Sequence, residues 1–69
     1  MEPITLFVNG EASKAAGSLT VREFLASQGL PEKGVAVERN REIVPRSAWD
    51  AVRLAPGDRL EIVHFVGGG

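Results

Sequence analysis

An Asn-Gly pair directly after a short alternating apolar run is the feature that most restricts how this chain can fold. Ile4–Val8 reads Ile-Thr-Leu-Phe-Val, and Asn9-Gly10 follows it at once. Asn and Gly both tolerate positive φ, which a two-residue turn between antiparallel strands requires. The sequence therefore predicts a β-hairpin whose return strand covers Glu11–Ala15.

Thr20 and Glu23 indicate the start of one short helix. They fit a capping box, in which the Thr20 side chain caps the helix and Glu23 reaches back from the third helical position. Gly29 and Pro31 end the helix, which is predicted over Val21–Gln28. Because an isolated helix of this length is not stable in water, its apolar face must pack on a sheet. That face consists of Val21, Phe24 and Leu25.

The second half of the chain predicts three more strands and a single helical turn. The strands are expected at Val35–Glu38, Glu42–Val44 and Arg59–Val66, and the turn, of the 3₁₀ type, at Ser47–Trp49. Trp49 is interpreted as a cover of the core and not as a site residue. The first and last strands carry the densest apolar runs, so we expect them to be the best buried. The order predicts an α+β fold, with about five short strands in a mixed sheet and one helix packed on one face.

Size and charge exclude several classes of protein. The chain has 69 residues, 43% hydrophobic and 25% charged, which is typical of one small globular domain without room for a deep pocket. With a net charge of −1 and scattered basic residues, it has no basic face for nucleic acid. No apolar run approaches the roughly 20 residues that span a bilayer, and no signal peptide is apparent. We therefore expect a cytoplasmic protein with neither nucleic acid nor membrane as partner.

Side chains suited to catalysis or metal binding are scarce. The chain has no cysteine and one histidine, His64, which excludes thiolate metal sites, a cysteine nucleophile and a two-histidine site. His64 shares strand parity with Leu60 and Ile62, which favours a place at the edge of the core or in an interface. Acidic residues such as Glu38 and Glu42 lie beside arginines, and no glycine-rich phosphate motif is present. We expect no catalytic residue, no metal site and no cofactor, so this chain is not predicted to be an enzyme.

Three glycines, Gly67, Gly68 and Gly69, follow the last predicted strand. A frayed end, a cloning remnant and chance are alternative explanations, but at an average glycine usage of about 7% a chance run of three is improbable. A glycine segment has no Cβ atoms, adopts almost any backbone conformation and can thread a narrow channel. A terminal carboxylate is ionised at neutral pH and can attack a phosphorus centre. The pattern indicates a carrier whose end is chemically loaded by a partner.

The apolar strands also leave hydrophobic side chains on the face away from the helix. Strand alternation places Phe7, Val63 and Phe65 on that face. If the two strands are neighbours, these side chains form an exposed apolar patch beside the root of the glycine tail, which is typical of a partner-binding site. In the alternative arrangement, the loop at Pro56 or the turn at Trp49 covers them.

Together these residues resemble the ubiquitin-like β-grasp fold and, more narrowly, the sulfur carrier protein of thiamine biosynthesis, the ThiS family. The resemblance covers essentially the whole chain and implies a β-grasp domain over residues 1–66 and a flexible glycine tail over residues 67–69. Only Gly67 departs from the family pattern. The matching segments are Asn9-Gly10, Thr20-Val21 before Leu25, Val35-Ala36-Val37-Glu38 before Asn40, Ile43-Val44-Pro45-Arg46 with Trp49, Gly57-Asp58 and Gly68-Gly69.

The resemblance implies that an adenylyltransferase related to ubiquitin-activating enzymes adenylates the Gly69 carboxylate, using ATP that this chain does not itself bind. A cysteine desulfurase system then supplies sulfur, and the resulting thiocarboxylate donates it at thiazole synthase. Gly67 and Gly68 provide reach and clearance. Alternatives stay open: the sulfur serves molybdopterin formation or tRNA thiolation, or the domain is a protein-interaction module whose tail is never loaded.

Overall fold

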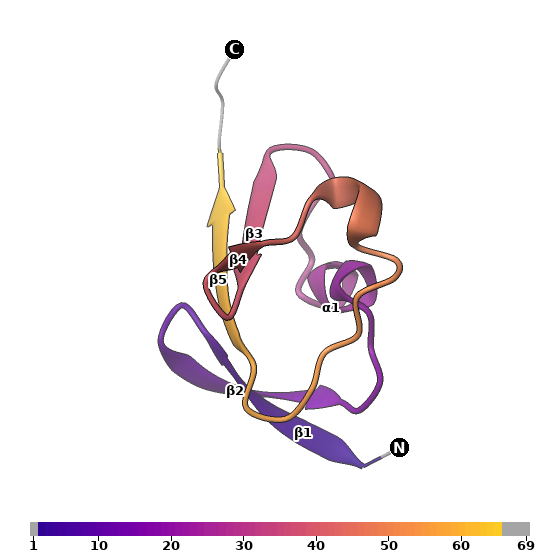
Figure 1. Ribbon diagram of the computed structural model, residues 1–69, viewed down its shortest axis with the longest axis vertical. Helices are drawn as coiled ribbons and strands as arrows, with labels where there is room; N and C mark the ends of the chain where they lie inside the picture. The colour runs from indigo at the N-terminus through magenta and orange to yellow at the C-terminus, as the bar shows by residue number, and fades with distance from the viewer. Residues whose placement is uncertain (1, 66–69) are drawn as a thin grey trace.

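The computed structural model of the protein describes residues 2–65, which form one mixed β-sheet with an α-helix on one face (Figure 1). The strand order is β2-β1-β5-β3-β4. The central pair, β1 and β5, is parallel, and the other neighbours are antiparallel. The predicted α+β class and mixed sheet are confirmed. The elements are β1 Pro3–Val8, β2 Glu11–Ala16, α1 Val21–Ser27, β3 Val35–Arg39, β4 Glu42–Ile43, the 3₁₀ helix η1 Arg46–Ala48, and β5 Arg59–His64.

The predicted hairpin is formed by β1 and β2, and its turn also joins the hairpin to the last strand. Asn9 (φ 49°) and Gly10 (φ 86°) both adopt left-handed conformations. The Asn9 side chain donates from Nδ2 to the Ile62 carbonyl at 3.1 Å and accepts from the Ile62 amide at Oδ1 at 2.8 Å. β1 pairs with β5 only through Phe7 and Val8. The side-chain amide of Asn9 therefore extends the contact between the two strands beyond the end of β1.

The capping box that opens α1 is confirmed. Thr20 Oγ1 accepts a hydrogen bond from the Glu23 amide at 3.1 Å, and Glu23 Oε1 accepts one from the Thr20 amide at 2.9 Å. This backbone hydrogen bond is the main reason that the pKa of Glu23 lies below its ordinary value. The helix ends one residue earlier than predicted, at Ser27, with Gln28 as its C-cap.

The core lies between α1, η1 and one face of the sheet. Trp49 is 2% exposed, and its Nε1 donates to the Val44 carbonyl at 3.0 Å, so the ring is buried without leaving its N–H unpaired. The interpretation of Trp49 as a residue of the core is confirmed. The buried hydrophobic side chains are Leu6, Val21, Phe24, Leu25, Val37, Val44, Trp49, Leu54 and Leu60.

A buried carboxylate joins the β3–β4 turn to the loop before β5. Asp58 is 5% exposed and accepts hydrogen bonds from Arg39 Nε at 2.7 Å, Asn40 Nδ2 at 3.1 Å and the Ala55 amide at 2.8 Å. Burial alone raises the pKa of this carboxyl, but the Arg39 hydrogen bond and the two others outweigh it, so the pKa is lowered. The ionised form of Asp58 therefore stabilises the fold.

Two expectations for the last strand are wrong. The strand β5 ends at His64 rather than Val66; Val66 itself lies outside the described residues. β5 is also not among the best-buried strands, because four of its six residues are exposed, whereas β1 has one exposed residue and is well buried, as expected. The reason is topological: β1 pairs with the start of β5 only, so its second half lacks a neighbour on that side.

Candidate functional site

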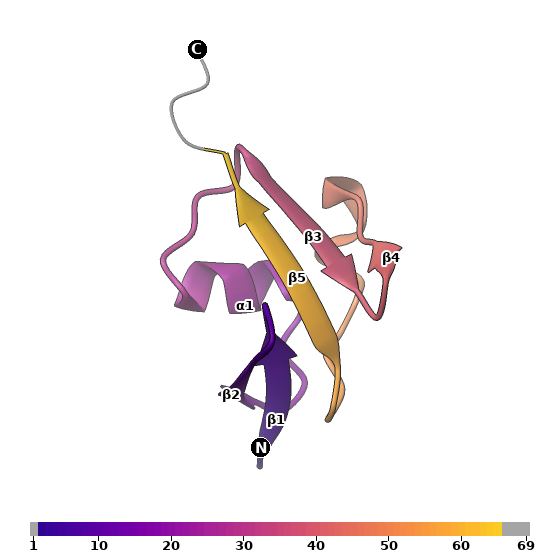
Figure 2. The ribbon, with the colours of Figure 1, turned by 90° about the vertical axis from the view of Figure 1, so that its left-hand side faces the viewer.

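The face of the sheet opposite α1 is open along its centre (Figures 1 and 2). Val63 is 51% exposed and Phe65 is 64% exposed. Neither the loop at Pro56 nor the turn at Trp49 buries these side chains, which removes the alternative in which a loop covers them. Two of the three predicted partner-binding residues are therefore accessible in the isolated domain.

Phe7 does not join Val63 and Phe65, and the expectation of one continuous patch is wrong for this residue. Phe7 lies opposite Arg59 at the start of β5, whereas Val63 is four residues further along that strand, roughly 13 Å away. The Arg59 guanidinium also stacks over the Phe7 ring, 4.8 Å from its centroid, and leaves the ring half-buried. The Phe7 ring is thus covered by a charged side chain and lies away from the apolar end of the face.

Two further apolar residues lie on the same face: Ala36 is beside Val63, and Ile43 is at the edge of the sheet, on the far side of Glu38. Ala36 on β3 is the direct partner of Val63, and Ile43 on β4 is the partner of Glu38 and is 75% exposed. Because directly paired residues point to the same side of a sheet, both share the face of Val63. We call Ala36, Ile43, Val63 and Phe65 the outer apolar surface. The alternation of Val35 and Val37 around Ala36 was a signal for the orientation of β3, but the sequence does not show which strand lies beside it.

Two carboxylates lie within the same face. Glu38 and Glu61 are direct partners on β3 and β5, and both are exposed. The ion pairs found among residues 2–65 involve other acidic side chains, namely Glu32, Asp50 and Asp58. Like charges placed directly opposite each other in a sheet are destabilising. The centre of the outer face therefore has a negative charge that does not serve the stability of the fold.

The end of the described chain, just before the glycine tail, is hydrogen-bonded to the loop before β3. Val35 pairs with His64 at the end of the β3–β5 ladder. One residue further on, the Phe65 amide donates to the Gly34 carbonyl at 2.7 Å. The predicted loaded group, Gly69, and the tail residues Gly67 and Gly68 lie outside the described residues. What the structure defines is the point from which they start.

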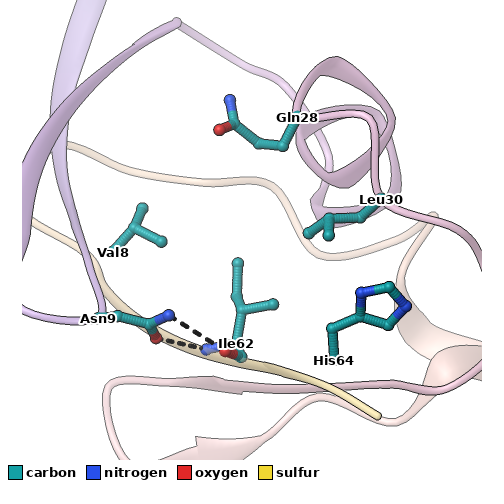
Figure 3. A pocket seen from close by; sticks show the side chains of 6 residues that line it. All are labelled: Val8, Asn9, Gln28, Leu30, Ile62 and His64. Atoms are coloured by element: carbon teal, nitrogen blue, oxygen red, sulfur yellow. Dashed lines mark hydrogen bonds between the residues drawn. The ribbon is translucent and has the colours of Figure 1, made fainter. Parts of the chain in front are cut away.

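An opening between the end of β1, the second half of β5 and the end of α1 has a volume of about 310 Å³ (Figure 3). His64 is at its rim and is exposed, close to Leu30 (Figure 3). Within residues 2–65, no three histidine, aspartate or glutamate side chains come together as a metal-ligand set. The opening is lined by Val8, Asn9, Gln28, Leu30, Ile62 and His64.

No helix in the described part of the chain has the length and apolar character needed to cross a membrane.

Comparison with known proteins agrees with this architecture. The model of the ThiS family matches residues 6–69. The sulfur carrier protein ThiS of Bacillus subtilis is 50% identical over 50 residues, covering 72% of this chain and 76% of that protein. The crystal structure of the thiamine biosynthesis protein ThiS from Geobacter metallireducens matches with a TM-score of 0.81 at 39% identity, covering 96% of this chain and 100% of that one.

A thiazole synthase of Paramagnetospirillum magneticum is 48% identical over 64 residues, which are 93% of this chain but only 20% of that relative. The chain thus spans a fifth of the length of this enzyme. The family match extends over nearly the whole chain, and the fold agrees with a ThiS crystal structure. This chain therefore belongs to the ThiS family.

Proposed function

We propose that this chain is a sulfur carrier for thiamine biosynthesis and that its loaded group is the carboxylate of Gly69. The observation that carries the proposal is the ThiS family match over residues 6–69, which includes all three terminal glycines. A relative of similar length is named a sulfur carrier protein, and a longer one is named thiazole synthase. The second name supports thiazole formation as the use of the sulfur.

The proposed chemistry takes place at one carbonyl carbon. A carboxylate oxygen of Gly69 attacks the α-phosphorus of ATP, pyrophosphate leaves, and an acyl adenylate forms. Hydrosulfide (HS⁻) then attacks the carbonyl carbon, and AMP leaves with one of the former carboxylate oxygens, so that sulfur has replaced this oxygen without a change of oxidation state. The resulting thiocarboxylate is the nucleophile that is delivered at thiazole synthase. Gly67 and Gly68 have no Cβ atoms that could hinder entry into a narrow active site.

The partners supply the catalytic groups that this chain lacks. We propose three: a ubiquitin-activating-enzyme-like adenylyltransferase that binds the ATP, a cysteine desulfurase system that provides the sulfur, and thiazole synthase. The chain itself has no cysteine and binds no cofactor in this scheme. An ATP-dependent loading step is expected in the cytoplasm, where ATP is available.

The outer apolar surface is the proposed docking site for these partners. Val63 and Phe65 are exposed immediately before the tail, so a partner that holds them also receives the chain end. The neighbouring pair Glu38 and Glu61 favours a partner with basic side chains around an apolar centre, because complementary charges speed and orient association. Phe7 lies outside this surface, and its role in partner binding stays a prediction.

The direct test is the intact mass of the protein after incubation with the adenylyltransferase, ATP and sulfide. We expect the mass change of one oxygen replaced by sulfur, located at Gly69 by fragmentation. An unchanged mass, or a change at another residue, would contradict the proposal.

A variant with one extra residue after Gly69 is the matched control for the reacting group. It moves the free carboxylate onto another residue and leaves the folded domain unaltered. We expect loading to be abolished and the melting temperature to stay the same. Substantial loading of Gly69 in this variant would refute the role of its free carboxylate.

A further inference from the structure

The backbone of Gly34 lies directly against the backbone of Phe65, the last described residue. The Phe65 amide donates to the Gly34 carbonyl at 2.7 Å. On the other side, a Cβ atom at Gly34 would lie 3.0 Å from the Phe65 carbonyl oxygen. That separation is tighter than most real contacts of a Cβ atom, so a side chain at this position would require the Phe65 backbone to move by a few tenths of an ångström.

This close approach distinguishes Gly34 from the other glycines with positive φ. Gly10, Gly29 and Gly57 also adopt left-handed conformations, but a Cβ atom at any of them would meet nothing within 4 Å. Their role is conformational, since left-handed backbone suits glycine. Gly34 (φ +75°) meets the same conformational demand and, in addition, makes room for Phe65.

The contact lies where the chain leaves the sheet. The β3–β5 ladder ends with the pair Val35 and His64, so Gly34 and Phe65 are the next residues on each side. Figure 2 shows the end of β5 beside the start of β3. The four residues after Phe65 can reach at most about 14 Å. Because this reach is short, a displaced Phe65 backbone shifts the point from which the chain end must enter the partner's active site.

We propose that Gly34 is a positioning residue for the loading reaction: it holds Phe65 so that the chain leaves the domain in the direction that brings its end to the partner's active site. This inference rests on the proposed function. Gly34 touches no reacting atom; it acts through the backbone of Phe65. Of the outer apolar surface, Gly34 contacts Phe65, whereas Ala36, Ile43 and Val63 are held in β3, β4 and β5. Docking through these three residues should therefore persist when the Gly34–Phe65 contact is disturbed.

The test uses two asparagine variants in the same loop, Gly34→Asn and Gly29→Asn. Asparagine tolerates left-handed backbone better than most residues, as Asn9 and Asn40 already do in this chain. The two positions have nearly the same φ, +75° and +74°. Only Gly34→Asn places a Cβ atom against Phe65, so Gly29→Asn controls for the cost of replacing a turn glycine.

The measurement is ATP–pyrophosphate exchange by the adenylyltransferase at varied concentrations of each carrier. For Gly34→Asn we expect kcat to fall about tenfold, because misplacement of a reacting group by about 1 Å costs this much or more, and KM to change less than twofold. Gly29→Asn should keep the wild-type kcat. Equal kcat values for the two variants, or a loss confined to KM, would overturn the inference.

Hydrogen exchange gives a second test, and its wild-type measurement does not depend on a variant that folds. The Phe65 amide should be protected, and in Gly34→Asn it should lose protection while the amides of β3 and β5 keep theirs. A wild-type Phe65 amide that exchanges as fast as an unstructured one would also overturn the inference. If the wild-type carrier is not adenylated at all, the proposed function fails; if it is adenylated and Gly34→Asn is adenylated equally well, only this inference fails.

Discussion

The two faces of the sheet are formed by the same strands, but apolar side chains are buried on one face and exposed on the other. On the inner face, Leu60 is 1% exposed and packs in the core with Trp49 and the apolar side of α1. On the outer face, three residues further along β5, Val63 is 51% exposed, and Ile43 on β4 is 75% exposed. In a domain this small, the apolar content of a strand alone does not show which of its side chains are buried. Apolar residues that the core does not need are available for binding a partner.

The acidic residues of the two regions differ in the same way. Asp58 is buried and accepts three hydrogen bonds, so its charge is compensated. Glu38 and Glu61 face each other on the open side of the sheet, where like charges repel. Asp58 stabilises the fold, whereas the pair Glu38 and Glu61 is suited to a basic partner.

The largest effect is expected in the core. Trp49→Ala should lower the free energy of unfolding by about 3–5 kcal/mol, because it removes a fully buried ring and leaves a cavity. For a domain with a total stability of this order, most molecules would then be unfolded at 37 °C. Urea unfolding measures the change, and Trp49→Phe, which keeps part of the ring volume, should lose less. A loss below about 1 kcal/mol would contradict the assignment of Trp49 to the core.

The next effect is expected at the buried carboxylate. Asp58→Asn should lower the free energy of unfolding by about 2 kcal/mol at neutral pH, since it weakens charge-assisted hydrogen bonds. The folded-state pKa of Asp58 is below its ordinary value of 3.8. Its stabilisation is therefore complete above that value and is lost as the pH falls through the lower, folded-state pKa. Thermal unfolding from pH 7 down to pH 3 should show the wild-type advantage shrinking in acid; a constant or growing advantage would be evidence against it.

A smaller effect, and one on binding only, is expected on the outer face. Val63→Ser should raise the KM of the carrier for the adenylyltransferase about fivefold to tenfold, and it should change the free energy of unfolding by less than about 0.5 kcal/mol. Ile62→Ser is the matched control one residue away, where the side chain packs against the core. That control should lose stability instead. If Val63→Ser is the variant that unfolds, the two faces have been assigned wrongly.

The smallest effect is expected at the pair of like charges. Glu61→Gln should raise the free energy of unfolding by a few tenths of a kcal/mol, because it removes repulsion from Glu38. It should also make the KM of the carrier less dependent on salt. Glu11→Gln replaces an exposed carboxylate opposite Val8 and should change neither quantity. The same response in both variants would mean that the position beside Glu38 has no special role.

Much of the architecture could be predicted from residues that are close together in sequence. The turn at Asn9-Gly10, the capping box of Thr20 and Glu23, and the five-stranded sheet with its single helix were all predicted from local patterns and the ThiS resemblance, and they are confirmed. These signals are local because a turn or a helix end is decided by φ preferences and hydrogen bonds within a few residues.

The composition of the outer face could be predicted only in part. Strand alternation correctly assigned Val63 to the side away from the core, but Phe7 proved to lie under Arg59, and Ile43 was not selected. The alternation of side chains follows from the strand itself. Which residues become neighbours across strands follows from strand order and register, and these depend on segments far apart in the chain.

The sequence by itself determined the elements, the fold class and the family of this protein, because the turn, cap and periodicity signals are built into neighbouring residues. Only the tertiary structure decided that the Asn9 amide bonds Ile62, that Ile43 shares a face with Val63, and that Gly34 holds Phe65. These contacts arise when β5 inserts between β1 and β3. Packing of the whole core selects that strand order, and no short stretch of sequence contains it.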